Sequence, residues 1–241
     1  VMPPQLQRQS QKEPLFPDTF WNLHTTKARA GRLLIVGGHQ HRFDQVQALY
    51  EISDAAGMGS IQAAMPDTLS KIVGPAGFGH FLPASGSGSL GRAALGELLH
   101  LAAESDCTVL GANLTNNAET GILAESLLKQ SDSRVVVTPE AIEVAKFHPD
   151  LITVNPNVLV VTPMTGLFSL ANHHNLPIAI KPRAGIMGKI AILQQLVAIS
   201  RCSYVVFDGE VLVASSGKLS LTPLKTALSD HQAVMIGLAA T

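Results

Sequence analysis

The chain has 241 residues, of which 46% are hydrophobic and 15% charged, and its formal net charge is −1. This composition excludes a disordered chain, and the absence of a lysine and arginine cluster argues against a nucleic-acid-binding protein. No apolar run approaches the roughly 18 residues that a transmembrane helix needs, and residues 1–20 contain four prolines and no apolar stretch typical of a signal peptide. We therefore expect a cytoplasmic globular protein that binds neither nucleic acid nor a membrane.

The first strong element of secondary structure follows a polar N-terminal segment. Residues 1–31 contain prolines and no hydrophobic periodicity, so we expect an N-terminal arm followed by one domain over residues 32–241. Leu33–Val36 is a continuous apolar run, closed by Gly37 and Gly38. A run of this kind is typical of a strand that is buried on both faces of a parallel sheet.

Helices and strands then alternate along the middle of the chain. In chain order, the patterns predict a helix over Phe43–Ala56 closed by Gly57, a strand over Ser60–Met65, a short helix over Asp67–Val73, a long loop over residues 74–91, a helix over Ala93–Ala103, a strand over Thr108–Gly111, and a helix over Ala118–Leu128 capped by Asn116 or Asn117.

Two later strands each run directly into a Thr-Pro pair. Val135–Val137 precedes Thr138-Pro139, and Val158–Val161 precedes Thr162-Pro163. Threonine caps helices and proline suits the first helical position, so both pairs are predicted to be strand-to-helix junctions. Ligands usually bind where helices begin at the carboxyl edge of a parallel sheet, so this edge is the expected site.

The last third of the chain is expected to close the sheet with antiparallel strands. The patterns predict a short strand over Ile178–Ile180, a helix over Ile186–Ile199, a hairpin of Tyr204–Phe207 and Glu210–Val213 around Asp208-Gly209, an extension of it at Leu219 and Leu221, and a helix beginning over Ala233–Ala240. That last helix runs to the end of the sequence, which hints at further elements after Thr241. The alternation as a whole predicts an α/β domain whose mostly parallel sheet carries helices on both faces.

Two glycine-rich segments have part of the pattern of a phosphate-binding loop. Gly86–Gly91 matches the spacing G-x-G-x-x-G, but no strong strand precedes it, so we expect a flexible loop before a helix. Gly185–Lys189 has too short an interval between its glycines for a P-loop, and a solvated loop is the preferred interpretation. The alternative is that Lys181, Arg183 and Lys189 hold an anion near a helix start.

Histidine and cysteine residues give no strong sign of a metal site. His39 and His41 flank the turn after the first strand, but two imidazoles without a third ligand do not make a zinc site. Cys107 and Cys202 lie in or beside predicted strands and are expected to be buried free thiols. We therefore expect no protein-bound metal.

One family resemblance covers roughly residues 32–241. The segment Arg32–Gly38, the helix end Asp54–Gly59 and Pro66 resemble the NAD(P)H-hydrate dehydratase family, and the spacing from Gly38 to Gly57 fits its pattern without a gap. Weaker matches follow in order at Ser105-Asp106 before Gly111, at Thr138–Ile142, at Thr162-Pro163 and in the hairpin before Asp230. The resemblance implies a ribokinase-like three-layer α/β/α fold, ADP or ATP with Mg as cofactor, and the repair of hydrated nicotinamide cofactors.

The family's site positions can be carried over to this chain one by one. The resemblance implies Asp230 as the catalytic acid or base, substrate contacts from Gly38, His39, Gln45, Thr115 and Met164, and nucleotide contacts from Asp208, Gly209 and Ser229.

Several of these positions depart from the family pattern. Asp44-Gln45-Val46 stands where the family has Gly-Ala-Pro, and Gly111-Ala112-Asn113-Leu114-Thr115 where it has Gly-Pro-Gly-Leu-Gly. Asp208-Gly209 falls near its Lys-Gly, Met164 stands in place of its histidine in Thr-Pro-His-Pro-Gly-Glu, and Ala227–Asp230 replaces its Gly-Thr-Gly-Asp. Side chains in place of glycines block the close approach of backbone to phosphate, which weakens an anion hole.

Three functions remain after this comparison. The first is a diverged ADP/ATP-dependent NAD(P)H-hydrate dehydratase-like protein, which would be a carbon-oxygen lyase if active, with a nucleotide-type ligand in the ancestral cleft. The alternative is a catalytically inactive ribokinase-like subunit for binding or assembly, and the second alternative is a small-molecule kinase of the same superfamily. In each case a nucleotide-type small molecule and a homo-oligomer are the expected partners.

Overall fold

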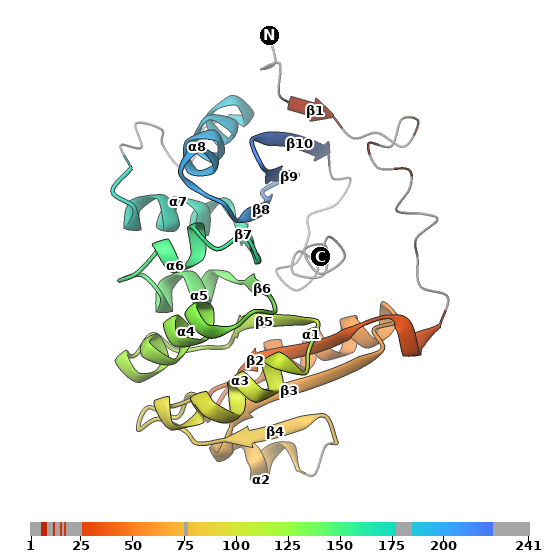
Figure 1. Ribbon diagram of the computed structural model, residues 1–241, viewed down its shortest axis with the longest axis vertical. Coiled ribbons are helices and arrows are strands. Elements are labelled where there is room, and N and C mark those ends of the chain that lie inside the picture. Colours follow the sequence, from red (N-terminus) through yellow and green to blue (C-terminus); the bar gives the residue numbers. More distant parts are fainter. Residues whose placement is uncertain are drawn as a thin grey trace.

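In the described part of the chain, the fold is built on one ten-stranded sheet with the order β1-β10-β9-β8-β7-β6-β5-β2-β3-β4 (Figure 1). The computed structural model describes residues 6–8, 12, 15, 17, 26–74, 77–176 and 185–223. The strands are β1 (Leu6–Arg8), β2 (Arg32–Gly37), β3 (Ser60–Pro66), β4 (Gly79–Leu82), β5 (Cys107–Ala112), β6 (Arg134–Val137), β7 (Val158–Pro163), β8 (Ser203–Phe207), β9 (Glu210–Ser215) and β10 (Lys218–Pro223).

All neighbouring strands from β4 to β8 are parallel, and the sheet changes direction only at its other end. There β9 is antiparallel to both β8 and β10, and β1 joins β10 in parallel. The sequence-based prediction of a mostly parallel sheet with an antiparallel hairpin near its end is confirmed.

Helices cover both faces of the sheet. They are α1 (Asp44–Ala55), α2 (Ser70–Val73), α3 (Leu95–Ala103), α4 (Ala118–Gln130), α5 (Pro139–Val144), α6 (Asp150–Thr153), α7 (Met164–His173) and α8 (Ile186–Ile199), with 3-10 turns η2 (Lys27–Arg29), η3 (Asp67–Leu69) and η4 (Arg92–Ala94). Buried side chains of α3 to α8 pack on one face, and those of α1 and η3 on the other. The three-layer α/β/α architecture is therefore confirmed.

Strand β2 lies between these two layers, as its apolar run predicts. Leu34 and Val36 belong to the core under α3 to α8, whereas Leu33 and Ile35 belong to the core under α1. Its last residue, Gly37, approaches β5 so closely that a β-carbon would lie 1.9 Å from the carbonyl oxygen of Ala112. Only glycine fits at this contact.

Several predicted turns and caps are present. Asn117 caps α4, because its Oδ1 accepts a hydrogen bond from the backbone N–H of Thr120 at 3.0 Å. Gly57 follows the end of α1 with a φ of +89°, the left-handed conformation that ends many helices. Asp208 and Gly209 form the turn between β8 and β9.

One local prediction is wrong and two are confirmed in part. Residues 74–91 are not one long loop, because Gly79–Leu82 forms β4, whose short sequence at the sheet edge carries little apolar alternation. Both Thr-Pro pairs are strand-to-helix junctions, as predicted. At the first, Pro139 begins α5 and Thr138 precedes it, but the Thr138 hydroxyl donates to the carbonyl of Gly111 at 3.0 Å and does not cap the helix. At the second, the strand continues through Pro163, so α7 begins one residue later.

Other predictions concern parts of the chain that lie partly or wholly outside the described residues. The short strand over Ile178–Ile180, the helix over Ala233–Ala240 and the site residues Ser229 and Asp230 fall there. In the described part, Leu6–Arg8 of the expected N-terminal arm forms a strand of the same sheet. No helix among the described residues is both long and apolar enough to cross a membrane.

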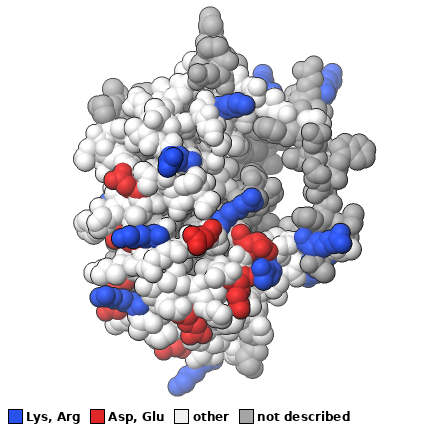
Figure 2. Space-filling model, in the orientation of Figure 1, with Lys and Arg blue, Asp and Glu red and all other residues white. Residues whose placement is uncertain are grey.

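The described surface carries charges of both signs. Basic and acidic side chains are interspersed on the face shown in Figure 2. Cys107 and Cys202 are buried and form no disulfide bond in the described part of the chain, and burial raises the pKa of the Cys202 thiol to about 11.

Candidate functional site

The strand order reverses between β2 and β5, and the candidate site lies at their carboxyl ends. From β2 the chain moves through α1 to β3 on one side, while β5 and the strands that follow it lie on the other side. In open α/β sheets, ligands bind in the crevice outside the carboxyl ends of strands at such a reversal. Here the N–H of Gly38 donates to the carbonyl of Ala112 at 2.6 Å, which holds the two strand ends together.

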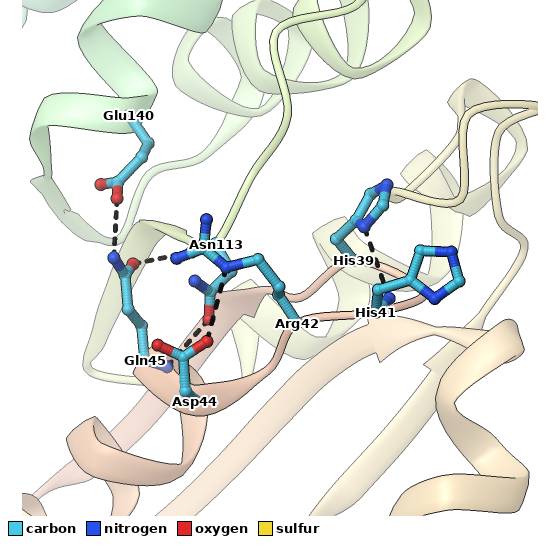
Figure 3. A network of polar contacts seen from close by, with 7 residues as sticks. All are labelled: His39, His41, Arg42, Asp44, Gln45, Asn113 and Glu140. Carbon is cyan, nitrogen blue, oxygen red and sulfur yellow. Dashed lines mark hydrogen bonds and ion pairs between the residues drawn. The ribbon is translucent and has the colours of Figure 1, made fainter.

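Two amide side chains bridge this reversal point by reciprocal hydrogen bonds (Figure 3). The backbone N–H of Gln45, in the first turn of α1, donates to Asn113 Oδ1 at 2.8 Å. In return, the backbone N–H of Asn113 donates to Gln45 Oε1, also at 2.8 Å. Asn113 has a φ of +59°, which asparagine tolerates better than other residues with a β-carbon, and it is only 6% exposed.

The bridge extends to the end of β6. Gln45 Nε2 donates to Glu140 Oε1 at 2.8 Å, and the hydroxyl of Thr138 lies 3.1 Å from Glu140 Oε2. Thr138 in turn contacts Gly111, where the φ is +119° and a β-carbon would lie 2.0 Å from its hydroxyl oxygen. The loops after β2, β5 and β6 are thus joined by direct hydrogen bonds.

One polar atom of this cluster has no hydrogen-bond partner among the described residues. Asn113 Nδ2 is buried and unpartnered in the described part of the chain. A buried donor without a partner costs about 1–3 kcal/mol. Beside it, Arg42 and Asp44 form an exposed ion pair with Nε and Oδ1 3.7 Å apart (Figure 3).

His39 connects the loop after β2 to the loop over Gly86–Gly91. Its Nε2 lies 2.8 Å from the carbonyl oxygen of Ser87, and its Nδ1 lies 3.4 Å from the backbone N–H of His41. A carbonyl can only accept and an N–H can only donate, so the neutral ring carries its proton on Nε2. In the same loop, Ser89 pairs with His39 through the backbone, and Ser89 Oγ lies 2.6 Å from Thr115 Oγ1. Ser89 thus links His39, after β2, to Thr115, after β5.

Gly86–Gly91 forms a loop before η4, as predicted. No group of three or more histidine, cysteine, aspartate or glutamate side chains that could hold a metal ion occurs among the described residues.

Two further predicted contact positions lie along the same edge at β7 and β8. Met164 is the first residue of α7, and its side chain is 4% exposed and packed in the core. Asp208 lies in the turn after β8, where Lys189 Nζ approaches Asp208 Oδ2 at 3.1 Å and Glu210 Oε2 at 3.5 Å. Lys189 also donates to the backbone carbonyl of Asp208 at 2.9 Å.

Lys181 and Arg183 of the alternative anion site lie outside the described residues. The helix predicted over Ile186–Ile199 is confirmed, so the solvated loop preferred for Gly185–Lys189 is wrong at Lys189. It lies in the first turn of α8, which begins at Ile186, and its side chain is only 15% exposed. The two acidic groups of the β8–β9 hairpin hold it there, a contact between distant segments that the local sequence does not reveal.

The structure places the described site predictions at one edge, in two groups. The first group follows β2 and β5 and contains Gly38, His39, Gln45 and Thr115. The second group follows β7 and β8 and contains Met164, Asp208 and Gly209. Sequence reasoning missed Asn113 and Glu140. A polar residue directly after a buried strand, and an acid directly after a Thr-Pro junction, were the available signals.

This sheet order, with helices on both faces, is that of a ribokinase-like α/β fold. Solved structures agree. The chain is similar to a ribokinase-like superfamily protein from Enterococcus faecalis V583 (TM-score 0.68, 12% identity, 99% of this chain and 82% of that one). It is also similar to a hypothetical protein from Streptococcus mutans (TM-score 0.60, 13% identity, 93% and 76%).

A third similar structure is the ADP/ATP-dependent NAD(P)H-hydrate dehydratase of Bacillus subtilis, co-crystallised with ATP and Mg²⁺ and soaked with CoA (TM-score 0.60, 12% identity, 92% of this chain and 78% of that one). No protein-family model and no curated protein matches the chain. The ribokinase-like fold expected from the resemblance is therefore confirmed, and the dehydratase is among the proteins that share it.

Proposed function

We propose that the protein binds a nucleotide-type ligand, ADP or ATP with Mg, at the carboxyl edge of its sheet. The observation that carries this proposal is the strand reversal between β2 and β5, because Gly38, His39, Gln45 and Thr115 follow these two strands at the same edge that holds the second group after β7 and β8. The dehydratase of Bacillus subtilis has the same fold and was crystallised with ATP and Mg²⁺. In the leading form of the proposal, the chain is a diverged NAD(P)H-hydrate dehydratase-like lyase in which Asp230 is the acid or base.

The predicted nucleotide contacts Asp208 and Gly209 lie after β8, and this part of the carboxyl edge is expected to prefer a phosphate that is bound to a cation. Asp208 and Glu210 bear two negative charges against the single positive charge of Lys189, so the cluster as a whole repels a bare phosphate. The described residues contain no ready set of metal ligands. Mg²⁺ would therefore be held chiefly by the nucleotide's own phosphates and by water, as is usual for this ion.

A specific observation favours a second candidate, a non-catalytic subunit for binding or assembly. Gln45, Asn113 and Glu140 are bonded to one another at the reversal point, where an enzyme would direct such groups at a substrate. In this form the protein binds nucleotide without turnover and acts as a homo-oligomer. Analytical ultracentrifugation of the full chain measures that assembly directly.

Calorimetric titration with ADP, ATP, AMP and NADPH, each with and without Mg²⁺, tests the common part of the proposal. Binding of ADP or ATP that strengthens with Mg²⁺ supports it, and no heat at millimolar ligand overturns it. Asp208→Asn removes one negative charge beside Lys189, so we expect it to reduce the dependence on Mg²⁺. Asp54→Asn is the matched control, because Asp54 is as exposed as Asp208 and also pairs with a lysine, Lys27, but lies at the far end of α1 from the carboxyl edge.

Turnover of NADPH hydrate then separates the two candidates. Dehydration by the wild type that is lost in Asp230→Asn supports the lyase, and equal rates in both remove Asp230 from the mechanism. Nucleotide binding without any turnover supports the non-catalytic subunit. Consumption of ATP with a small-molecule alcohol would identify the kinase alternative instead.

A further inference from the structure

A depression lies at the amino edge of the sheet, opposite the candidate site. It has a volume of about 380 Å³ and is lined by Arg29, Gly31, Arg32, Gly59, Ser60 and Asp106. These residues precede or begin strands β2, β3 and β5, whereas the proposed nucleotide site follows the strand ends. The six residues of β2 separate the two edges by about 20 Å.

Two glycines form part of the wall of this pocket. Gly31 has a φ of +80°, and it follows Ala30 at a φ of −85°. Successive N–H groups in such a turn can form a concave surface that attracts anions, although here the N–H of Ala30 already donates to the carbonyl of Lys27 at 3.1 Å. At Gly59 a β-carbon would lie 2.4 Å from the carbonyl oxygen of Lys27, so no side chain can extend from this position and fill the space.

The turn already binds one carboxylate of the protein itself. The backbone N–H of Arg32 donates to Asp106 Oδ2 at 2.8 Å, and Arg32 Nε lies 3.5 Å from the same oxygen. The hydrogen bond from this N–H is the main reason that the pKa of Asp106 is lowered, so the carboxylate stays charged. The local backbone and the Arg32 guanidinium therefore suit a negatively charged oxygen.

The charges of the pocket do not balance. Asp106 offsets Arg32, and the neighbouring Lys27 is paired with Asp54 at 2.7 Å. Arg29, in the last turn of η2, is exposed and forms no ion pair with any residue in the described ranges. Arg29 thus contributes to the pocket lining a guanidinium whose charge no ion pair with a described residue offsets.

We propose that this amino-edge pocket binds a small oxyanion of the phosphate or carboxylate class. The planar guanidinium groups of Arg29 and Arg32 present paired N–H donors that match two oxygens of such an anion. Ser60 adds a hydroxyl at the pocket wall. The volume lies near the lower end of the range for ligand pockets, about 300–1,000 Å³, so the ligand is phosphate- or pyrophosphate-sized and smaller than a dinucleotide.

Calorimetric titrations of the full chain with inorganic phosphate, pyrophosphate and succinate at low ionic strength test the proposal. Arg29→Gln is expected to weaken binding at least about 10-fold, since hydrogen bonds to charged groups are the strong ones. Arg92→Gln is the matched control, because Arg92 is exposed in η4 and has no ion pair with a described residue. Asp106→Asn should strengthen binding several-fold, because it removes the competing negative charge and keeps an oxygen acceptor for the N–H of Arg32.

The probes also identify the ligand class. Binding of phosphate and pyrophosphate without succinate assigns a phosphate site, and binding of succinate alone assigns a carboxylate site. The proposal is overturned if no probe binds the wild type, or if Arg29→Gln and Arg92→Gln weaken binding equally. It is also overturned if Asp106→Asn weakens binding while its circular dichroism melting curve matches the wild type. Arg29→Gln leaves the carboxyl edge intact, so its affinity for ADP should equal that of the wild type. The oxyanion site and the nucleotide site can therefore be refuted independently of each other.

Discussion

Replacing Gln45 by alanine is expected to destabilise the fold far more than the same change two residues later. The Gln45 side chain accepts from the buried N–H of Asn113 and donates to Glu140, both at 2.8 Å. Gln47 makes one comparable bond, from its Nε2 to Glu51 Oε1 at 2.8 Å, but on the exposed surface of the same helix. The two glutamines thus differ in what their removal leaves behind.

The magnitude follows from the groups that lose their partner. Without the Gln45 side chain, the N–H of Asn113 is buried and unsatisfied, which costs about 1–3 kcal/mol. Glu140 is only half-buried and regains water, while alanine returns a few tenths of a kcal/mol through its higher helix propensity. The free energy of unfolding should therefore fall by about 2 kcal/mol for Gln45→Ala, against about 0.3 kcal/mol for Gln47→Ala, an ordinary pair on a helix surface.

Urea denaturation followed by circular dichroism measures both variants. The midpoint should fall for Gln45→Ala without a change in slope, and the melting temperature should drop by about 4–8 °C for a chain of this size. Equal losses for the two variants would refute the bridge as a buried structural contact. A change in slope would instead show that the native or denatured state had altered in compactness.

Three further predictions concern packing and titration elsewhere in the fold. Thr108→Val in β5 removes a buried hydroxyl with no partner in the described part of the chain, so the free energy of unfolding should rise by about 1 kcal/mol in urea. Gly166→Ala should lower the free energy of unfolding by about 1–3 kcal/mol, because the β-carbon would lie 2.0 Å from Thr162 Oγ1. In Gly96→Ala, the control, the space for a β-carbon is open, so the free energy of unfolding should rise by up to about 1 kcal/mol. Burial lowers the pKa of His174 below 6.5, so the unfolded chain takes up the proton first and stability falls as the pH drops below that value; His174→Gln should flatten this part of the stability–pH curve, and an unchanged curve would contradict the assignment.

Most of the sheet could be predicted because its strands are buried on both faces. A strand such as Leu33–Val36 must then be apolar at every position, and this pattern is visible in the sequence. The hairpin around Asp208-Gly209 and the cap at Asn117 depend on interactions between residues close in sequence, so they could be predicted too. At these positions, the conformation that the local sequence favours is also the one found in the fold.

The strands at the two edges could not be predicted in the same way. Leu6–Arg8 has three residues and pairs with β10, more than 200 positions later, while Gly79–Leu82 is only partly buried on β3. Edge strands are stabilised largely by backbone pairing to a neighbour, which leaves little trace in their own side chains. The position of Lys189 against Asp208 is likewise a long-range contact.

Two departures from the dehydratase pattern meet in the bridge at the reversal point. Gln45 stands where the family has alanine, which has no side-chain amide, and Asn113 stands where it has glycine at a position that here needs a φ of +59°. Each side chain accepts from the backbone N–H of the other residue, and that N–H is present whichever side chain stands there. Gln45→Ala and Asn113→Gly should therefore each remove one bond and leave the other, so in a double-mutant cycle the two losses should add to within about 0.5 kcal/mol. A coupling of about 1 kcal/mol or more, measured by urea denaturation, would contradict this and show that each bond depends on both side chains.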